Sequence, residues 1–242
     1  MTDLVVVVPA YNAARHLRPV IERIFAAAPD GLQRVVIVDD GSRDQTLDVA
    51  RAVAAERPQV EVIARPRNGG YGAAMKDGLA AARAAGAQRV AGVHADGQYS
   101  PEVLGQLLGE LARRGLDLLQ GSRIAGAGAR GAREGGMPLY KVAGNWALNQ
   151  LERRVLGLPL TDFHSGYLLY GARALATVPF DRLSDSFDFD LEVIASARAR
   201  GLTVGESPIP THYGDEISYL NPLTYGMRVL RVMWRYKKGE YA

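Results

Sequence analysis

Residues 35–44 read VVIVDDGSRD, and this stretch sets a pattern that recurs through the chain. Its β-branched run predicts a buried strand over residues 34–38, and the polar run behind it predicts a tight turn. A helical pattern follows over residues 46–56, with Asp44 placed to cap it. Strand, short polar turn and helix in that order are the unit from which parallel sheets are built.

The same unit recurs on both sides of this stretch. Residues 4–8 predict a buried strand, and residues 14–28 predict a helix with apolar side chains at helical spacing. Further predicted strands are residues 60–64, 89–93, 117–120, 161–170 and 203–207, and further predicted helices are residues 72–85, 101–114, 140–156 and 189–200. The alternation predicts an α/β fold with an open, mainly parallel, twisted sheet and helices on both faces, as in Rossmann-like proteins.

Composition narrows the class of protein. The chain has 242 residues, of which 48% are hydrophobic and 23% charged, as expected for one globular domain. It has no cysteine, which excludes disulfides, thiolate catalysis and cysteine-ligated metals. The net charge of +3 is modest and basic-aromatic interleaving is missing from the main body, so we expect no nucleic acid partner.

The two ends of the chain differ in character. Pro9 interrupts the first apolar run and no basic segment precedes it, so we expect no signal peptide and a cytoplasmic protein. Residues 222–241 predict a basic amphipathic helix, which either lies on an anionic membrane or packs on the domain or on a second copy of the chain. We therefore expect one domain over residues 1–220 and a helix over residues 221–242 that belongs to the domain or contacts a membrane. Residues 124–136, rich in Gly, Ala and Arg, are expected to form a mobile loop.

Adjacent carboxylates follow the strand at residues 34–38. In open parallel sheets, ligands bind beyond the carboxyl ends of the strands, where Asp39 and Asp40 are expected to lie. An aspartate there can accept a hydrogen bond from a nucleobase N–H or a ribose hydroxyl. Turn and cap chemistry explains Ser42 and Asp44, but it does not explain two like charges side by side.

A second polar group, HADGQ, follows the strand at residues 89–93. Asp96 and Gln98 offer oxygen ligands and His94 offers a nitrogen, a sparse set that suits Mg²⁺ or Mn²⁺ shared with phosphate oxygens. Such a metal would neutralise charge on a departing nucleoside diphosphate. The alternative is a polar loop in front of the helix that begins at Pro101.

Together these segments resemble the family-2 glycosyltransferases, and within them the dolichyl- or polyprenyl-phosphate sugar synthases. The resemblance spans roughly residues 4–220 and rests on residues 5–12, 38–44, 68–72, 96–102, 121–123, 161–167 and 206–210. It implies a GT-A fold and an inverting transfer from a UDP- or GDP-sugar to a polyprenyl (undecaprenyl or dolichyl) phosphate at the cytoplasmic membrane face. It also implies Mg²⁺ or Mn²⁺ as the cofactor, and it leaves the oligomeric state open.

The resemblance assigns roles to individual residues. Asp96 and Gln98 would hold the metal, and His94 stands where the family usually begins its aspartate–X–aspartate motif. Lys141 stands near the position of an arginine that usually follows the mobile loop. The expected nucleotide and phosphate contacts are Pro9, Tyr11, Asn12, Asp39 or Asp40, Lys76, Arg123 and Lys141.

The identity of the acceptor decides whether a base is needed. A lipid phosphate is already an anion near neutral pH, so alignment and charge screening would suffice. A hydroxyl acceptor on a lipid, glycan or small molecule would need a carboxylate base, and Asp188, Asp190 and Glu192 lie where the wider family places one. The acidic run equally suits a capped helix start. A nucleotide-sugar-binding protein without turnover, suggested by His94, is a third possibility.

Overall fold

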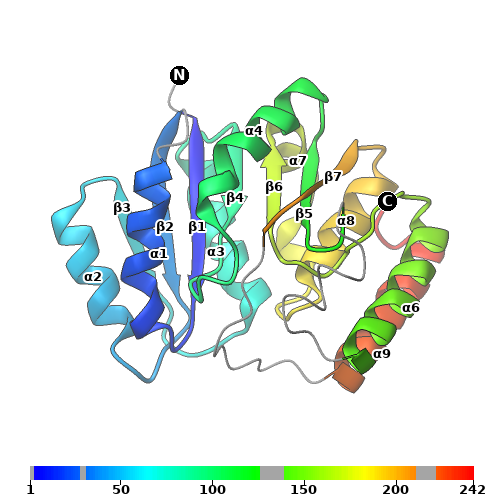
Figure 1. The fold of residues 1–242 in the computed structure, drawn as a ribbon, viewed down its shortest axis with the longest axis horizontal. Helices are drawn as coiled ribbons and strands as arrows, with labels where there is room; N and C mark the ends of the chain where they lie inside the picture. The colour runs from blue at the N-terminus through cyan, green and yellow to red at the C-terminus, as the bar shows by residue number, and fades with distance from the viewer. Residues whose placement is uncertain (1–2, 28–30, 126–138, 211–221) are drawn as a thin grey trace.

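The computed structural model describes residues 3–27, 31–125, 139–210 and 222–242, with the backbone alone at residues 139–143, 145, 222 and 223. A seven-stranded sheet in the order β3-β2-β1-β4-β6-β5-β7 runs through this part of the chain (Figure 1). The strands are β1 (Leu4–Ala10), β2 (Leu32–Asp39), β3 (Val60–Ala64), β4 (Arg89–Gly92), β5 (Leu118–Ser122), β6 (Leu168–Gly171) and β7 (Val204–Pro208).

One strand runs against the others. β6 is antiparallel to both of its neighbours, β4 and β5, whereas the remaining pairs of adjacent strands are parallel. The carboxyl ends of β1, β2 and β4 therefore meet at one edge of the sheet. Because β6 runs in the opposite direction, its first residue lies at the same edge, and the segment before Leu168 lies there as well.

Helices cover both faces of the sheet and enclose two apolar cores. One core lies under α1, α2 and α4, and the other lies under α3, α7, α8 and α9. The helices are α1 (Ala14–Ala27), α2 (Thr46–Glu56), α3 (Tyr71–Ala84), α4 (Leu104–Arg113), α6 (Leu139–Leu156), α7 (Ala172–Thr177), α8 (Phe189–Ala199) and α9 (Pro222–Lys237), with 3-10 turns η1 (Pro101–Val103) and η2 (Phe180–Arg182). The expected α/β architecture is confirmed.

Strand β1 shows why its sequence is apolar throughout. Val5 and Val7 point into one core, and Val6 and Val8 point into the other, because successive side chains of a strand alternate between faces. Helix α3 approaches β1 closely at Gly78, where an added Cβ would lie 2.2 Å from Cγ1 of Val7. The missing side chain lets this helix sit directly on the sheet.

Three expectations about elements need comment. The strand expected over residues 161–170 forms only from Leu168, because the polar side chains before it serve a loop. The helix expected from residue 101 begins as a 3-10 turn and becomes α-helical at Leu104. Most of the loop expected over residues 124–136 lies outside the described residues.

The C-terminal helix α9 has a buried and an exposed side. Val229, Val232 and Met233 belong to the core shared with α8, whereas Met227 and Trp234 are exposed. Helix α6 lies beside α9 (Figure 1). Within the described residues, no helix combines the length and the apolar character needed to cross a membrane.

Candidate active site

The loops after β1 and β2 are tied to each other at the edge of the sheet. The Asn12 N–H donates to Oγ of Ser42 at 3.0 Å, and the Arg43 N–H donates to Oδ1 of Asn12 at 2.9 Å. The Ala13 N–H donates to Oγ1 of Thr46 at 2.8 Å. Asn12 also has a φ of 51°, which asparagine tolerates better than most residues. Asn12, which we expected to line a nucleotide pocket, thus holds the two loops together through its amide oxygen and its backbone N–H.

Pro9 and Tyr11 lie beside this junction. Pro9 stands opposite Val38 in the parallel pairing of β1 and β2, and Ala10 stands opposite Asp39. Pro9 and Tyr11 are both half-buried. The structure therefore brings both expected nucleotide contacts to the same edge as Asp39.

The adjacent carboxylates Asp39 and Asp40 have different environments. Asp40 accepts the N–H groups of Gly69 and Gly70, each at 2.9 Å, and pairs with the guanidinium of Arg65. Among the described residues, the carboxylate of Asp39 accepts one hydrogen bond, the long one from the Ser42 N–H to Oδ2 at 3.3 Å. Its Oδ1 is buried and has no hydrogen-bond partner among the described residues. Such an acceptor is able to take a hydrogen bond from a bound ligand or from an ordered water.

The HADGQ segment forms a turn stabilised by its own aspartate. Oδ1 of Asp96 accepts the Gln98 N–H at 2.9 Å, and both side chains remain partly accessible. The described residues contain no cluster of three or more His, Cys, Asp or Glu that could enclose a metal. One or two oxygen ligands completed by substrate phosphates and water are nevertheless a common arrangement for Mg²⁺ and Mn²⁺. Asp96 and Gln98 fit that arrangement.

His94 is packed among aromatic rings. Its ring centroid lies 5.1 Å from that of Tyr71 and 5.3 Å from that of Tyr99, and its Nε2 lies 3.4 Å from the Tyr71 hydroxyl. Gly166 completes the enclosure, since an added Cβ there would lie 2.7 Å from Nε2. These contacts give His94 a packing role in this conformation, and its role as a metal ligand stays a prediction.

Asp190, in the first turn of α8, contacts the aromatic cluster of Tyr71, His94 and Tyr99. Its Oδ2 accepts the Tyr71 hydroxyl at 2.8 Å, and its buried Oδ1 has no partner among the described residues. Burial raises the pKa of Asp190 to about 6, against the opposing effects of the Tyr71 hydrogen bond and the His94 charge. Tyr71 was not among the residues expected at the site, although it directly follows the Asn68-Gly69-Gly70 turn.

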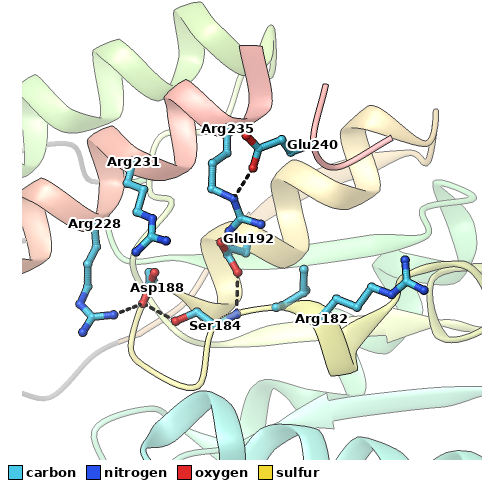
Figure 2. A pocket seen from close by; sticks show the side chains of 9 residues that line it. Arg182, Ser184, Asp188, Glu192, Arg228, Arg231, Arg235 and Glu240 are labelled. Atoms are coloured by element: carbon cyan, nitrogen blue, oxygen red, sulfur yellow. Dashed lines mark hydrogen bonds and ion pairs between the residues drawn. The ribbon is translucent and has the colours of Figure 1, made fainter. Parts of the chain in front are cut away.

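Asp188 and Glu192 face away from this group. Helical geometry puts residues 188 and 190 about 200° apart around α8, whereas residues 188 and 192 share a face. Asp188 accepts the Ser184 hydroxyl at 2.7 Å and an Arg228 N–H at 3.1 Å, and Glu192 accepts the Ser184 N–H at 2.6 Å (Figure 2). The structure thus does not bring Asp188, an expected catalytic residue, together with Asp190.

Two of the expected cationic contacts are engaged in ion pairs. Arg123 forms a bidentate ion pair with Asp162, donating from Nε at 2.7 Å and from Nη2 at 2.9 Å. Although burial acts to raise the pKa of Asp162, the charge and hydrogen bonds of Arg123 hold it below its ordinary value. Lys76 donates to the Leu183 carbonyl at 2.5 Å and to Asp185 at 2.7 Å. These pairs support loops around the site, and the Lys141 side chain lies outside the described residues.

A mainly parallel sheet whose carboxyl edge carries a buried carboxylate oxygen of Asp39 and the turn at Asp96 has a candidate ligand site at the position where open α/β sheets bind their ligands. The chain belongs to glycosyl transferase family 2, whose sequence profile matches residues 5–178. It is a nucleotide-sugar-dependent glycosyltransferase with a GT-A fold.

Two relatives are named as transferases that act on undecaprenyl or dolichyl phosphate. The chain is 32% identical over 204 residues to the undecaprenyl-phosphate mannosyltransferase of Micrococcus luteus, covering 84% of this chain and 81% of that protein. It is 26% identical over 222 residues to the UDP-N-acetylglucosamine–dolichyl-phosphate N-acetylglucosaminyltransferase of Methanococcus voltae, covering 86% and 85%.

A solved structure shares the fold. The glucosyl-3-phosphoglycerate synthase of Mycobacterium tuberculosis, in complex with Mn²⁺, UDP and glucosyl-3-phosphoglycerate, superposes with a TM-score of 0.70 at 20% sequence identity. The match covers 96% of this chain and 79% of that one. This likeness confirms the expected GT-A fold.

Proposed function

We propose that this glycosyltransferase moves a sugar, with inversion, from a UDP- or GDP-sugar to a polyprenyl phosphate at the cytoplasmic face of the membrane. Binding of the nucleotide-sugar donor is supported by Oδ1 of Asp39, which is buried at the carboxyl edge of the sheet and has no partner among the described residues. Asp39 binds the base or ribose of the donor through this oxygen. Asp40 has a supporting role, because both of its oxygens already hold Gly69 and Gly70.

The diphosphate of the donor is expected beside the turn at Asp96. Asp96 and Gln98 would hold Mg²⁺ or Mn²⁺ there, and the bound metal would neutralise charge on the departing diphosphate. The Gln98 N–H occupies Oδ1 of Asp96, and within the described residues Oδ2 accepts no hydrogen bond, which supports this assignment. His94 would contribute by packing against Tyr71 and Tyr99 and holding both rings in place at the carboxyl edge of the sheet, where we expect the sugar.

The names of the relatives and an exposed apolar surface support a lipid-linked acceptor. Met227, Leu230 and Trp234 lie on one side of α9, at helical spacing, and Trp146 of the neighbouring α6 is 65% exposed. Lys238 lies over the Trp234 ring at 3.7 Å. Exposed tryptophans with basic neighbours suit the headgroup layer of an anionic membrane, from which a polyprenyl phosphate would be taken.

A hydroxyl acceptor is the second candidate, and Asp190 favours it. A carboxylate whose pKa is about 6 can act as a general base near neutral pH, and its Oδ1 has no partner among the described residues. A lipid phosphate would need no such base. The effect of Asp190→Asn on transfer therefore separates the two acceptor classes.

The first experiment is a thermal-shift screen of UDP- and GDP-sugars with and without Mn²⁺. A donor that binds the native state must raise the melting temperature. We expect Asp39→Asn to weaken binding of that donor by about tenfold or more, because an amide replaces the carboxylate that offers Oδ1 as an acceptor. Asp48→Asn, an exposed change on α2, is the matched control and should leave binding unchanged. Equal donor affinity in wild type and Asp39→Asn would refute the donor assignment.

The second experiment is a transfer assay with undecaprenyl phosphate, using the donor that the screen identifies. Transfer that survives Asp190→Asn supports the lipid-phosphate acceptor. Transfer to a hydroxyl compound that disappears in this variant supports the second candidate. A stable donor complex with no transfer to either acceptor would instead support a nucleotide-sugar-binding protein.

A further inference from the structure

A hollow of about 420 Å³ lies between the start of α8 and helix α9. Four arginines line it, Arg182 from η2 and Arg228, Arg231 and Arg235 from α9. None of the described residues that line it comes from the carboxyl ends of β1, β2 or β4. It is therefore separate from the edge that carries Asp39 and Asp96.

The charges in the hollow do not cancel. Three carboxylates also line it, and each is paired: Asp188 with Arg228 at 3.1 Å, and Glu192 and Glu240 with Arg235, the latter at 2.9 Å. Four guanidinium groups against three carboxylates leave one excess positive charge.

The four arginines differ in their ion pairs. Within the described residues, Arg182 and Arg231 form no ion pair. Figure 2 shows Arg231 pointing from α9 toward Asp188, between Arg228 and Arg235, whereas Arg182 stands at the opposite rim. Arg231 therefore offers hydrogen-bond donors to a molecule that enters the hollow.

We propose that this hollow binds a phosphate group, with Arg231 as its principal contact and Arg228 beside it. A guanidinium matches the geometry of phosphate oxygens and forms charge-assisted hydrogen bonds with them. The paired carboxylates fix Arg228 and Arg235 in place, so part of the site is preorganised before the ligand arrives. Arg231 is free to adjust to the ligand.

The phosphate has two possible sources, a membrane lipid headgroup or a free phosphate compound. The arginine positions 228, 231 and 235 are turned by about 100° from the exposed apolar positions 227, 230 and 234 on α9. A helix lying on a bilayer through its apolar side would hold the hollow at headgroup level. A dissolved phosphate could enter equally well, so the test treats the two sources separately.

The first arm measures thermal unfolding of the full chain against inorganic phosphate, at constant ionic strength set with chloride. Phosphate should raise the melting temperature of wild type. Arg231→Gln should need about tenfold more phosphate for the same rise, a change of about 1.4 kcal/mol. The matched control is Lys237→Gln, which removes one exposed positive charge from the same helix outside the hollow and should respond like wild type. Arg231 is exposed and unpaired among the described residues, so its replacement should leave the unliganded melting temperature unchanged.

The second arm measures co-sedimentation with phosphatidylcholine vesicles that contain or lack phosphatidic acid. Weaker binding of Arg231→Gln than of Lys237→Gln to the phosphatidic acid vesicles supports the site with a lipid as its ligand. Equal vesicle binding of the two variants, together with the higher phosphate requirement of Arg231→Gln in the first arm, supports the site with a free phosphate as its ligand. No phosphate effect beyond that of chloride, with equal vesicle binding of the two variants, overturns the proposal. Neither arm contains donor or acceptor, so failure here is distinct from failure of the proposed transferase activity.

Discussion

Asp190 allows a quantitative test of the electrostatics of the site. Its carboxyl is buried and its pKa rises from 3.8 to about 6, so its ionised form is less stable in the folded protein than in the unfolded chain. Each unit of pKa difference corresponds to about 1.4 kcal/mol, which makes the penalty about 3 kcal/mol once the group is ionised in both states. The penalty is absent below pH 4 and develops as the pH rises to about 6. Asp190→Asn should therefore stabilise the protein at pH 8 by up to about 3 kcal/mol.

The assay is urea denaturation of wild type and Asp190→Asn at pH 8 and pH 5. The asparagine oxygen can still accept the Tyr71 hydroxyl, so the gain comes mainly from removing the charge. It should shrink to about 1.5 kcal/mol at pH 5, where the wild-type carboxyl is mostly protonated in the folded state. Asp181→Asn, an exposed change in η2, should give no such difference between the two pH values. An equal gain at both pH values, or a loss at pH 8, would refute the reasoning.

Further expected outcomes concern packing, a buried ion pair and the metal. Gly78→Ala should lower the free energy of unfolding by about 1–3 kcal/mol in urea denaturation, because the new Cβ meets Val7; a gain would contradict this packing. Asp162→Asn should cost about 3–5 kcal/mol in the same assay, because Arg123 loses its bidentate partner; a loss below about 1 kcal/mol would rule that out. Asp96→Ala should abolish Mn²⁺-dependent turnover while the protein stays folded, with a small fall in melting temperature because the Gln98 N–H loses its acceptor; full activity would exclude Asp96 as the metal ligand.

The sequence predicted the parallel part of the fold because its strands are buried on both faces. The run of valines in β1 shows this: each face of the strand needs apolar side chains, so the pattern is continuous. It did not reveal that β6 lies between β4 and β5 and runs against them. That placement depends on pairings such as Ala91 with Leu169, which join segments far apart in the chain.

The sequence located the site but did not distinguish its members. Asp39 and Asp40 look alike as neighbours, and they differ only because Arg65 and the Gly69 and Gly70 N–H groups reach Asp40. The ion pair of Arg123 was equally hidden, since its partner lies 39 positions away. Local patterns identify which side chains reach the edge of the sheet, whereas long-range contacts decide which of them remain available.

The order of strands in the sheet also bears on how the chain folds during synthesis. Strands β1 to β4 can pair among themselves as soon as they leave the ribosome, and they form one half of the sheet. In the described sheet β5 pairs only with β6 and β7, which are made later: Leu118 meets Tyr170 and Val204. Until those strands emerge, β5 and the outer edge of β4 are unpaired and able to join another chain. We therefore expect formation of the second half of the sheet to be the slower and more aggregation-sensitive stage of folding.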